Sequence, residues 1–243
     1  MDITTQSVTL GGEDINIPAF LVTPEDEGIY PGVIVVQEIF GVNEHIRDVT
    51  SRIAAKGYVA IAPAIYQRIA PHFETGYTAE DVKVGREYKN QTKASELLKD
   101  IQTAINYLYT LPNVKKTGVG TMGFCFGGHV TYLTATLEDI KATASYYGAG
   151  IANWCPGECD PTITRTKEIK GAINCYFGMD DQSIPLEQVD QIEKELQKYD
   201  ITHKVFRYQG AEHGFNCDRR SSYNETVARE AWQETLNLFQ QTL

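Results

Sequence analysis

The chain alternates short apolar runs with longer amphipathic stretches. The apolar runs have the length of buried strands and are bounded by polar or glycine-rich segments. Between them, apolar residues recur every three or four positions, which is the spacing of one face of a helix. The runs that predict strands are 33–36, 58–62, 118–124, 142–147, 172–177 and 203–208, and the stretches that predict helices are 44–56, 95–108, 186–198 and 226–239.

This alternation predicts an α/β fold with a mostly parallel, twisted sheet and helices on both faces. Residues 7–10 and 15–22 predict antiparallel edge strands at the start. Residues 69–91 are polar and predict an irregular segment that caps the sheet edge or overhangs a pocket. No repeat or linker interrupts the pattern, and 243 residues fit a single α/β domain, so we expect one domain over residues 1–243.

Charge and hydropathy exclude several classes of function. The chain has 22 basic and 32 acidic residues, a formal net charge of −10, which argues against nucleic acid or anionic membranes as partners. The N-terminus lacks the basic and apolar regions of a signal peptide, and runs such as 32–36 are too short to span a membrane. We therefore expect a cytoplasmic protein with no nucleic-acid or membrane partner.

The number of cysteines also favours a cytoplasmic protein. There are five, an odd number, and without a secretion signal this is typical of free thiols in a reducing cytoplasm. Cys155 and Cys159 form a C-x3-C pair, but no second pair stands at metal-ligand spacing. We expect no metal site.

The strongest chemical signal follows the apolar run 118–124. There, the pattern G-x-C-x-G-G places Cys125 just before a helix predicted to begin near His129. Glycines around the central residue permit a strained strand-to-helix turn that exposes its side chain at the end of the sheet. A cysteine at a helix N-terminus lies near the positive end of the helix dipole, which favours the nucleophilic thiolate. Cys125 is the candidate nucleophile, and the alternative is a buried structural cysteine.

Two backbone amides are candidates for stabilising an oxyanion. One is the N–H of Phe126, directly after the nucleophile, and the other is the N–H of Ile39, in the loop that follows strand 33–36. Glu38 comes directly after the same strand, so we expect it to be partly desolvated and near the site. A structural acid with a charged partner is the alternative for Glu38.

The segments after the last two predicted strands contain candidate groups for proton transfer. Asp180 and Asp181 follow run 172–177, and one of them could orient a histidine, although the residue pattern does not choose between them. A turn acid that caps the next helix is the alternative. His213 lies in a glycine-bounded loop after run 203–208 and is the candidate proton shuttle. The remaining histidines, which have no matching partner, are His45, His72, His129 and His203.

In chain order, the segments QEIFGVN, PAIYQR, GFCFGG, GMDDQSIP and AEHGF resemble the marker segments of the dienelactone hydrolase (carboxymethylenebutenolidase) family. The resemblance implies the α/β-hydrolase fold and hydrolysis of a cyclic enol-lactone by a Cys–His–Asp triad without a cofactor. It assigns the nucleophile to Cys125 and the histidine to His213. Because the family's aspartate stands four residues before a proline, it assigns the acid to Asp181. Glu38 matches a family glutamate that contacts the resting thiol and helps to form the thiolate.

The resemblance also implies arginines that hold a substrate carboxylate. Arg86, with Tyr88 nearby, matches one of them. The other is expected four residues after the histidine, where this chain has Cys217, and Arg219 and Arg220 are close but not in register. A cysteine cannot replace a bidentate arginine contact, so this departure leaves the substrate open.

We therefore expect a cysteine-dependent hydrolase of a small-molecule lactone or ester, acting as a monomer or small homo-oligomer. A broader carboxylesterase or thioesterase on the same scaffold is the nearest alternative, and the cysteine at position 217 favours it. A non-catalytic binding module is a second alternative, against which the complete triad counts. The third is a metal or redox protein built on Cys155, Cys159, Cys175 and Cys217.

Overall fold

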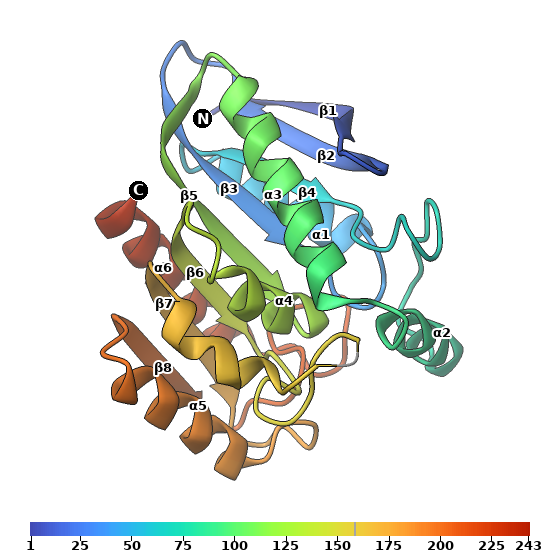
Figure 1. The fold of residues 1–243 in the computed structure, drawn as a ribbon, viewed down its shortest axis with the longest axis vertical. Coiled ribbons are helices and arrows are strands. Elements are labelled where there is room, and N and C mark those ends of the chain that lie inside the picture. Colours follow the sequence, from blue (N-terminus) through green and yellow to red (C-terminus); the bar gives the residue numbers. More distant parts are fainter. Residues whose placement is uncertain (158) are drawn as a thin grey trace.

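The computed structural model describes residues 1–157 and 159–243, and within them the strands form one eight-stranded sheet (Figure 1). The strand order is β1-β2-β4-β3-β5-β6-β7-β8. β1 pairs antiparallel with β2, β2 pairs antiparallel with β4, and all other neighbours are parallel, as the sequence predicts. The strands are β1 (Ile3–Gly11), β2 (Asn16–Pro24), β3 (Tyr30–Val36), β4 (Val59–Pro63), β5 (Val114–Phe124), β6 (Ile140–Tyr146), β7 (Ala172–Gly178) and β8 (His203–Tyr208).

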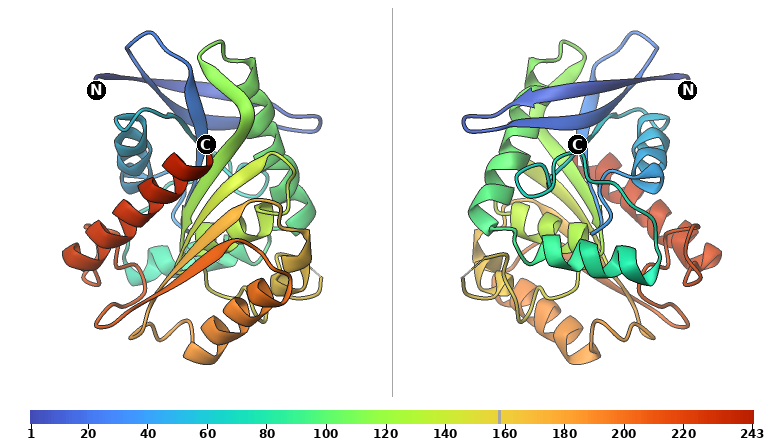
Figure 2. Two further views of the ribbon diagram at one scale, coloured as in Figure 1. Left: turned by 90° about the vertical axis from the view of Figure 1, so that its left-hand side faces the viewer. Right: turned by 90° about the vertical axis from the view of Figure 1, so that its right-hand side faces the viewer.

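Helices cover both faces of the sheet. Figure 2 shows α1 and α6 on one face and α3, α4 and α5 on the other. The central strands are consequently buried on both sides, and every residue of β4 is buried. The helical elements are α1 (Glu44–Ala54), α2 (Ala79–Lys89), α3 (Ala94–Thr110), α4 (Phe126–Thr134), the 3-10 helix η1 (Thr162–Glu168), α5 (Leu186–Lys198) and α6 (Glu225–Thr242). Within the described ranges, no helix is both long enough and apolar enough to cross a membrane.

Helix α2 corrects the prediction that residues 69–91 are irregular. Thr78 and Asp81 form a capping box at its start, each side chain accepting a hydrogen bond from the other's backbone N–H. Gly85 is its only buried residue, so the stretch has no apolar stripe that could have predicted a helix. The predicted overhang is confirmed, because Val82, Arg86 and Lys89 of α2 line the pocket described below.

The cysteines differ from the prediction of free thiols. Cys155 and Cys159 form a disulfide, with their Cα atoms 5.7 Å apart, a separation that a disulfide spans readily. Cys125, Cys175 and Cys217 are free. A metal site built on four of these cysteines is wrong, because two of the four thiols are bonded to each other. The redox alternative stays a prediction, because a disulfide is compatible with it.

Helix α4 can pack against the end of β3 only because residue 127 is glycine. A Cβ atom there would lie 2.4 Å from the carbonyl oxygens of both Val36 and Gln37. These are backbone atoms, so relieving the overlap would require moving the strand or the helix. The glycine therefore fixes the position of the turn that carries Cys125.

We expect Gly127→Ala to destabilise the protein by about 3 kcal/mol, since overpacking against rigid backbone outweighs the gain of about 1 kcal/mol from alanine in a helix. Urea unfolding measures the change. Gly11→Ala is the control, because nothing lies within 4 Å of its added Cβ. Equal stability of the two variants would contradict this account of the turn.

Candidate active site

Cys125 stands between β5 and α4 in a conformation that non-glycine residues rarely adopt. Its φ is 56° and its ψ is −118°, and its N–H donates to the carbonyl of Tyr146 at 3.0 Å. Such backbone strain costs about 1–3 kcal/mol and persists only where the surroundings enforce it. Helix α4 begins at Phe126, three residues before the predicted start near His129, so Cys125 itself is the N-cap residue.

The glycines of the motif allow the chain to pass close to itself at this turn. A Cβ on Gly123 would lie 2.3 Å from the carbonyl oxygen of Gly127, and one on Gly128 would lie 2.3 Å from that of Tyr146. The motif is thus a packing requirement of the turn. Its result is a half-buried thiol at the carboxyl end of β5 and the N-terminus of α4.

His213 and Asp181, from two other strand ends, meet in a hydrogen bond. Nδ1 of His213 lies 2.7 Å from Oδ2 of Asp181, and the other carboxylate oxygen accepts the N–H of Ser183 at 2.7 Å. The Asp181 side chain is fully buried. Because the carboxylate can only accept from Nδ1–H, this bond leaves Nε2 for other partners. Asp180, the other acid in the motif, is exposed.

The charges around His213 favour its protonated form. Burial lowers the pKa of His213, but the negative charge of Cys125 and the hydrogen bond to Asp181 outweigh burial and raise it to about 10. The surroundings therefore favour the imidazolium form of His213.

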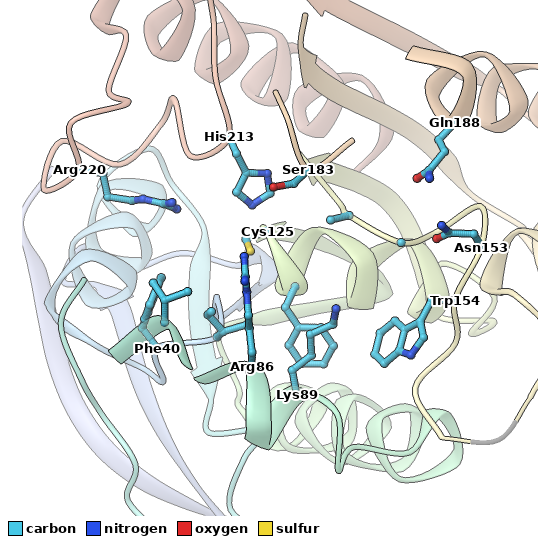
Figure 3. A pocket seen from close by; sticks show the side chains of 15 residues that line it. Phe40, Arg86, Lys89, Cys125, Asn153, Trp154, Ser183, Gln188, His213 and Arg220 are labelled. Atoms are coloured by element: carbon cyan, nitrogen blue, oxygen red, sulfur yellow. The ribbon is translucent and has the colours of Figure 1, made fainter. Parts of the chain in front are cut away.

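Cys125 and His213 open into a pocket of about 340 Å³ (Figure 3). Ile39, from the loop after β3, and Phe126, at the first position of α4, also line it. The first amide of a helix has no acceptor within that helix, so the Phe126 N–H is available to a ligand. Both amides predicted to stabilise an oxyanion thus belong to residues at the wall next to the thiol.

The pocket is lined by three cationic side chains: Arg86 and Lys89 from α2, and Arg220 from the loop before α6. Among the described residues that line it, none is a carboxylate. In Figure 3, Arg220 lies on one side of Cys125 and Lys89 on the other, with Arg86 between them. Burial lowers the pKa of Lys89, whose ammonium lies 4.2 Å from the centre of the Trp154 ring. The pocket therefore suits a small anionic ligand.

Glu38 is fully buried and pairs with Arg220, with 3.3 Å between Oε1 and Nη1. The resemblance implies contact between Glu38 and the resting thiol, whereas here the ionic partner of Glu38 is Arg220. Arg220 lines the pocket, although it does not stand at the position where the resemblance implies an arginine. Its position seven residues after His213 gave no motif to identify it, and only the fold of that loop brings it to the thiol.

Two other residues lie outside the pocket lining. Tyr88 packs against Tyr66 and Phe73, with ring centroids 6.1 and 4.8 Å away. Cys217, at the position where an arginine was expected, is buried, and its Sγ lies 3.3 Å from the hydroxyl of Tyr77. Lys89 and Trp154 also line the pocket, and the sequence did not predict them because their helix and loop have no recognisable pattern.

Comparisons with known proteins agree with this architecture. The model of the Dienelactone hydrolase family matches residues 17–243. A relative from Synechocystis sp., provisionally named a carboxymethylenebutenolidase, is 54% identical, and the match covers 100% of this chain and 99% of the relative. A Salmonella typhimurium protein with the same provisional name is 31% identical, and the match covers 97% of this chain and 86% of that protein. The crystal structure of a provisionally assigned dienelactone hydrolase from Klebsiella pneumoniae gives a TM-score of 0.89 at 30% identity. The match covers 99% of this chain and 100% of that structure's chain.

These matches span nearly the whole chain and confirm the predicted fold and family. The chain belongs to the dienelactone hydrolase family.

Proposed function

We propose that this protein hydrolyses the ring ester of a carboxylate-bearing enol-lactone, the dienelactone class, by acyl transfer to Cys125. The observation that carries the proposal is the His213–Asp181 hydrogen bond of 2.7 Å beside a thiol held at a helix N-terminus in the same pocket. These are the groups that nucleophilic acyl transfer requires. The names of the Synechocystis and Salmonella relatives refer to the same reaction class.

The proposed reaction has two halves. In the first, the Cys125 sulfur attacks the lactone carbonyl, the ring C–O bond breaks, and His213 gives its proton to the leaving enol oxygen. The product is a thioester that remains in the pocket. In the second half, His213 takes a proton from water, which attacks the thioester and releases the acid and the thiolate. Asp181 keeps the imidazole in the orientation that both halves need.

The tetrahedral intermediate in each half carries a negative oxygen. The backbone N–H groups of Ile39 and Phe126 are the proposed donors to it. Such a donor typically stabilises a transition state by about 3 kcal/mol. Both residues are buried, so their amides need little reorganisation when charge develops.

The cations of the pocket favour a substrate with a carboxylate over a neutral ester. Arg86, Lys89 and Arg220 surround the thiol, and the ionic partner of Arg220 is already the buried Glu38. We propose that Arg86 and Arg220 hold the carboxylate and that Arg220 replaces the guanidinium missing at position 217. The alternative, a broader carboxylesterase or thioesterase, does not require these cations.

Location and assembly are part of the same proposal. We propose that residues 1–243 act as one domain, as a monomer or small homo-oligomer, in the cytoplasm and without nucleic-acid or membrane partners. The net charge of −10 supports the absence of such anionic partners. The disulfide between Cys155 and Cys159 would have to resist reduction there.

The pKa of His213 tests the thiolate–imidazolium pair. We expect His213 to titrate near pH 10 in the wild-type protein and at a lower pH in Cys125→Ala, because that variant lacks the negative charge that raises the pKa while burial still lowers it. NMR titration of the imidazole Cε1–H measures both values. Cys217→Ser is the matched control and should leave the titration unchanged. An identical pKa in Cys125→Ala and wild type would contradict the ion pair.

A matched pair of substrates tests both the activity and the role of Arg86. Steady-state kinetics should show that wild-type protein hydrolyses a dienelactone with a free carboxylate faster than its methyl ester. Arg86→Gln should lower kcat/KM for the acid about tenfold, since an exposed charge-assisted contact contributes about 1.5 kcal/mol, and hardly change it for the ester. Lys83→Gln removes an exposed charge from the same helix outside the pocket lining and should affect neither substrate.

The outcomes of this experiment separate the candidate functions. Equal hydrolysis of the acid and the methyl ester by wild-type protein would favour the broader esterase. Absence of hydrolysis of either compound by folded protein would contradict the proposed reaction.

A further inference from the structure

Three side chains with metal-binding atoms meet in the interior next to the active site. They are Glu38, after β3, His45, in the first turn of α1, and Cys217, in the loop after His213. One ligand atom from each lies within 4.8 Å of the other two. All three residues are buried, with 0%, 3% and 0% of their surface exposed. In the described part of the chain, this is the one group of histidine, cysteine and acidic residues that converges in this way.

Two of these side chains have buried polar atoms without a partner. Oε2 of Glu38 and Nε2 of His45 make no hydrogen bond to any described residue. Oε1 of Glu38 is bound to Arg220, so Oε2 is the free oxygen of that carboxylate. Unpaired buried polar atoms are destabilising and rarely persist without a ligand, an ion or a water molecule to bind them. Two of the three converging side chains therefore carry a buried polar atom that a bound ion would satisfy.

We propose that Glu38, His45 and Cys217 bind a divalent transition-metal ion of the zinc class. One carboxylate oxygen, one imidazole nitrogen and one sulfur form a ligand set that suits zinc, whereas magnesium and calcium prefer oxygen ligands alone. Cys217 binds as the thiolate, its proton passes to solvent, and the charges of thiolate and carboxylate then balance that of the ion. The hydroxyl of Tyr77, 3.3 Å from the Cys217 sulfur, is placed to complete a tetrahedral set or to hold a water molecule that does.

The surroundings provide access for a cation from the surface. A surface hollow of about 390 Å³ reaches His45 and Tyr77, and on its wall Glu44 pairs with Arg219 and Glu74 pairs with Arg47. Asp48 and Asp218 place negative charge near His45, and Arg52 places positive charge there. Arg220 weakens metal binding, because it competes with the ion for the Glu38 carboxylate. The site therefore suits an exchangeable ion better than a permanent structural one.

This site departs from the sequence expectation of no metal. The three residues are separated by 7 and 172 positions, so no ligand spacing in the sequence connects them. Because Glu38 also binds Arg220 at the pocket wall, metal binding and binding of an anionic substrate should influence each other.

The test is isothermal titration calorimetry with zinc chloride, without thiol reductant. It uses Cys125→Ala protein as the background, so that the active-site thiol offers no competing ligand. We expect one equivalent of zinc to bind. Adding Cys217→Ser or His45→Gln should weaken binding at least tenfold, while adding Cys175→Ser, at a buried free cysteine elsewhere, should leave it unchanged. Circular dichroism checks that each variant is folded.

Cobalt supplies an independent readout of the sulfur ligand. We expect Co²⁺ to produce a thiolate-to-metal absorption band in the near ultraviolet that disappears in the Cys217→Ser variant. If folded background protein binds no zinc, or if the His45 and Cys217 variants bind it as tightly as the background, the proposal is wrong and the cluster holds at most a water molecule. Neither readout depends on hydrolysis, so the metal site can fail while the proposed activity stands, and the reverse.

Discussion

The junction between β5 and α4 holds Cys125 in a backbone conformation with positive φ, and the arrangement of the site follows from it. The conformation is unfavourable for a residue with a Cβ, so neighbouring contacts must maintain it. They do so because glycines at 123, 127 and 128 bring the turn against the backbone of β3 and β6. Any side chain at these positions would move the turn, and with it the thiol. The position of the nucleophile is thus set by the close approach of three backbone segments.

The parallel sheet then brings the other groups to the same place. Asp181 follows β7, His213 follows β8 and Ile39 follows β3, so each comes from a carboxyl end of a parallel strand. Helix α2 forms one wall of the pocket at this edge of the sheet. Gly85 allows α2 to lie against the loop after β3, because a Cβ at residue 85 would lie 2.4 Å from the Ile39 carbonyl oxygen. Arg86 follows directly in the chain. The close packing at Gly85 therefore also sets the position of Arg86, one of the cations expected to bind an anionic substrate.

Local pattern in the sequence was sufficient to predict which residues come together at the pocket. Cys125 has a glycine signature, and the acidic pair Asp180–Asp181 and His213 follow apolar strands, so the order of the elements brings them together. The choice of Asp181 over Asp180 came from the family resemblance. Contacts made by long side chains could not be predicted in this way. Arg220 reaches the pocket because its loop folds back to Glu38, and Tyr88 turns to an aromatic cluster although it is only two positions from Arg86. The capped but weakly apolar helix α2 was missed for lack of a hydrophobic stripe.

In the proposed reaction one thiol, that of Cys125, performs the chemistry. Graded alkylation with iodoacetamide, followed by peptide mass spectrometry and assay of dienelactone hydrolysis on the same samples, tests it most directly. We expect the remaining activity to equal the fraction of unmodified Cys125, whatever the modification of Cys217 or Cys175. Substantial hydrolysis by protein in which Cys125 is fully alkylated would contradict it.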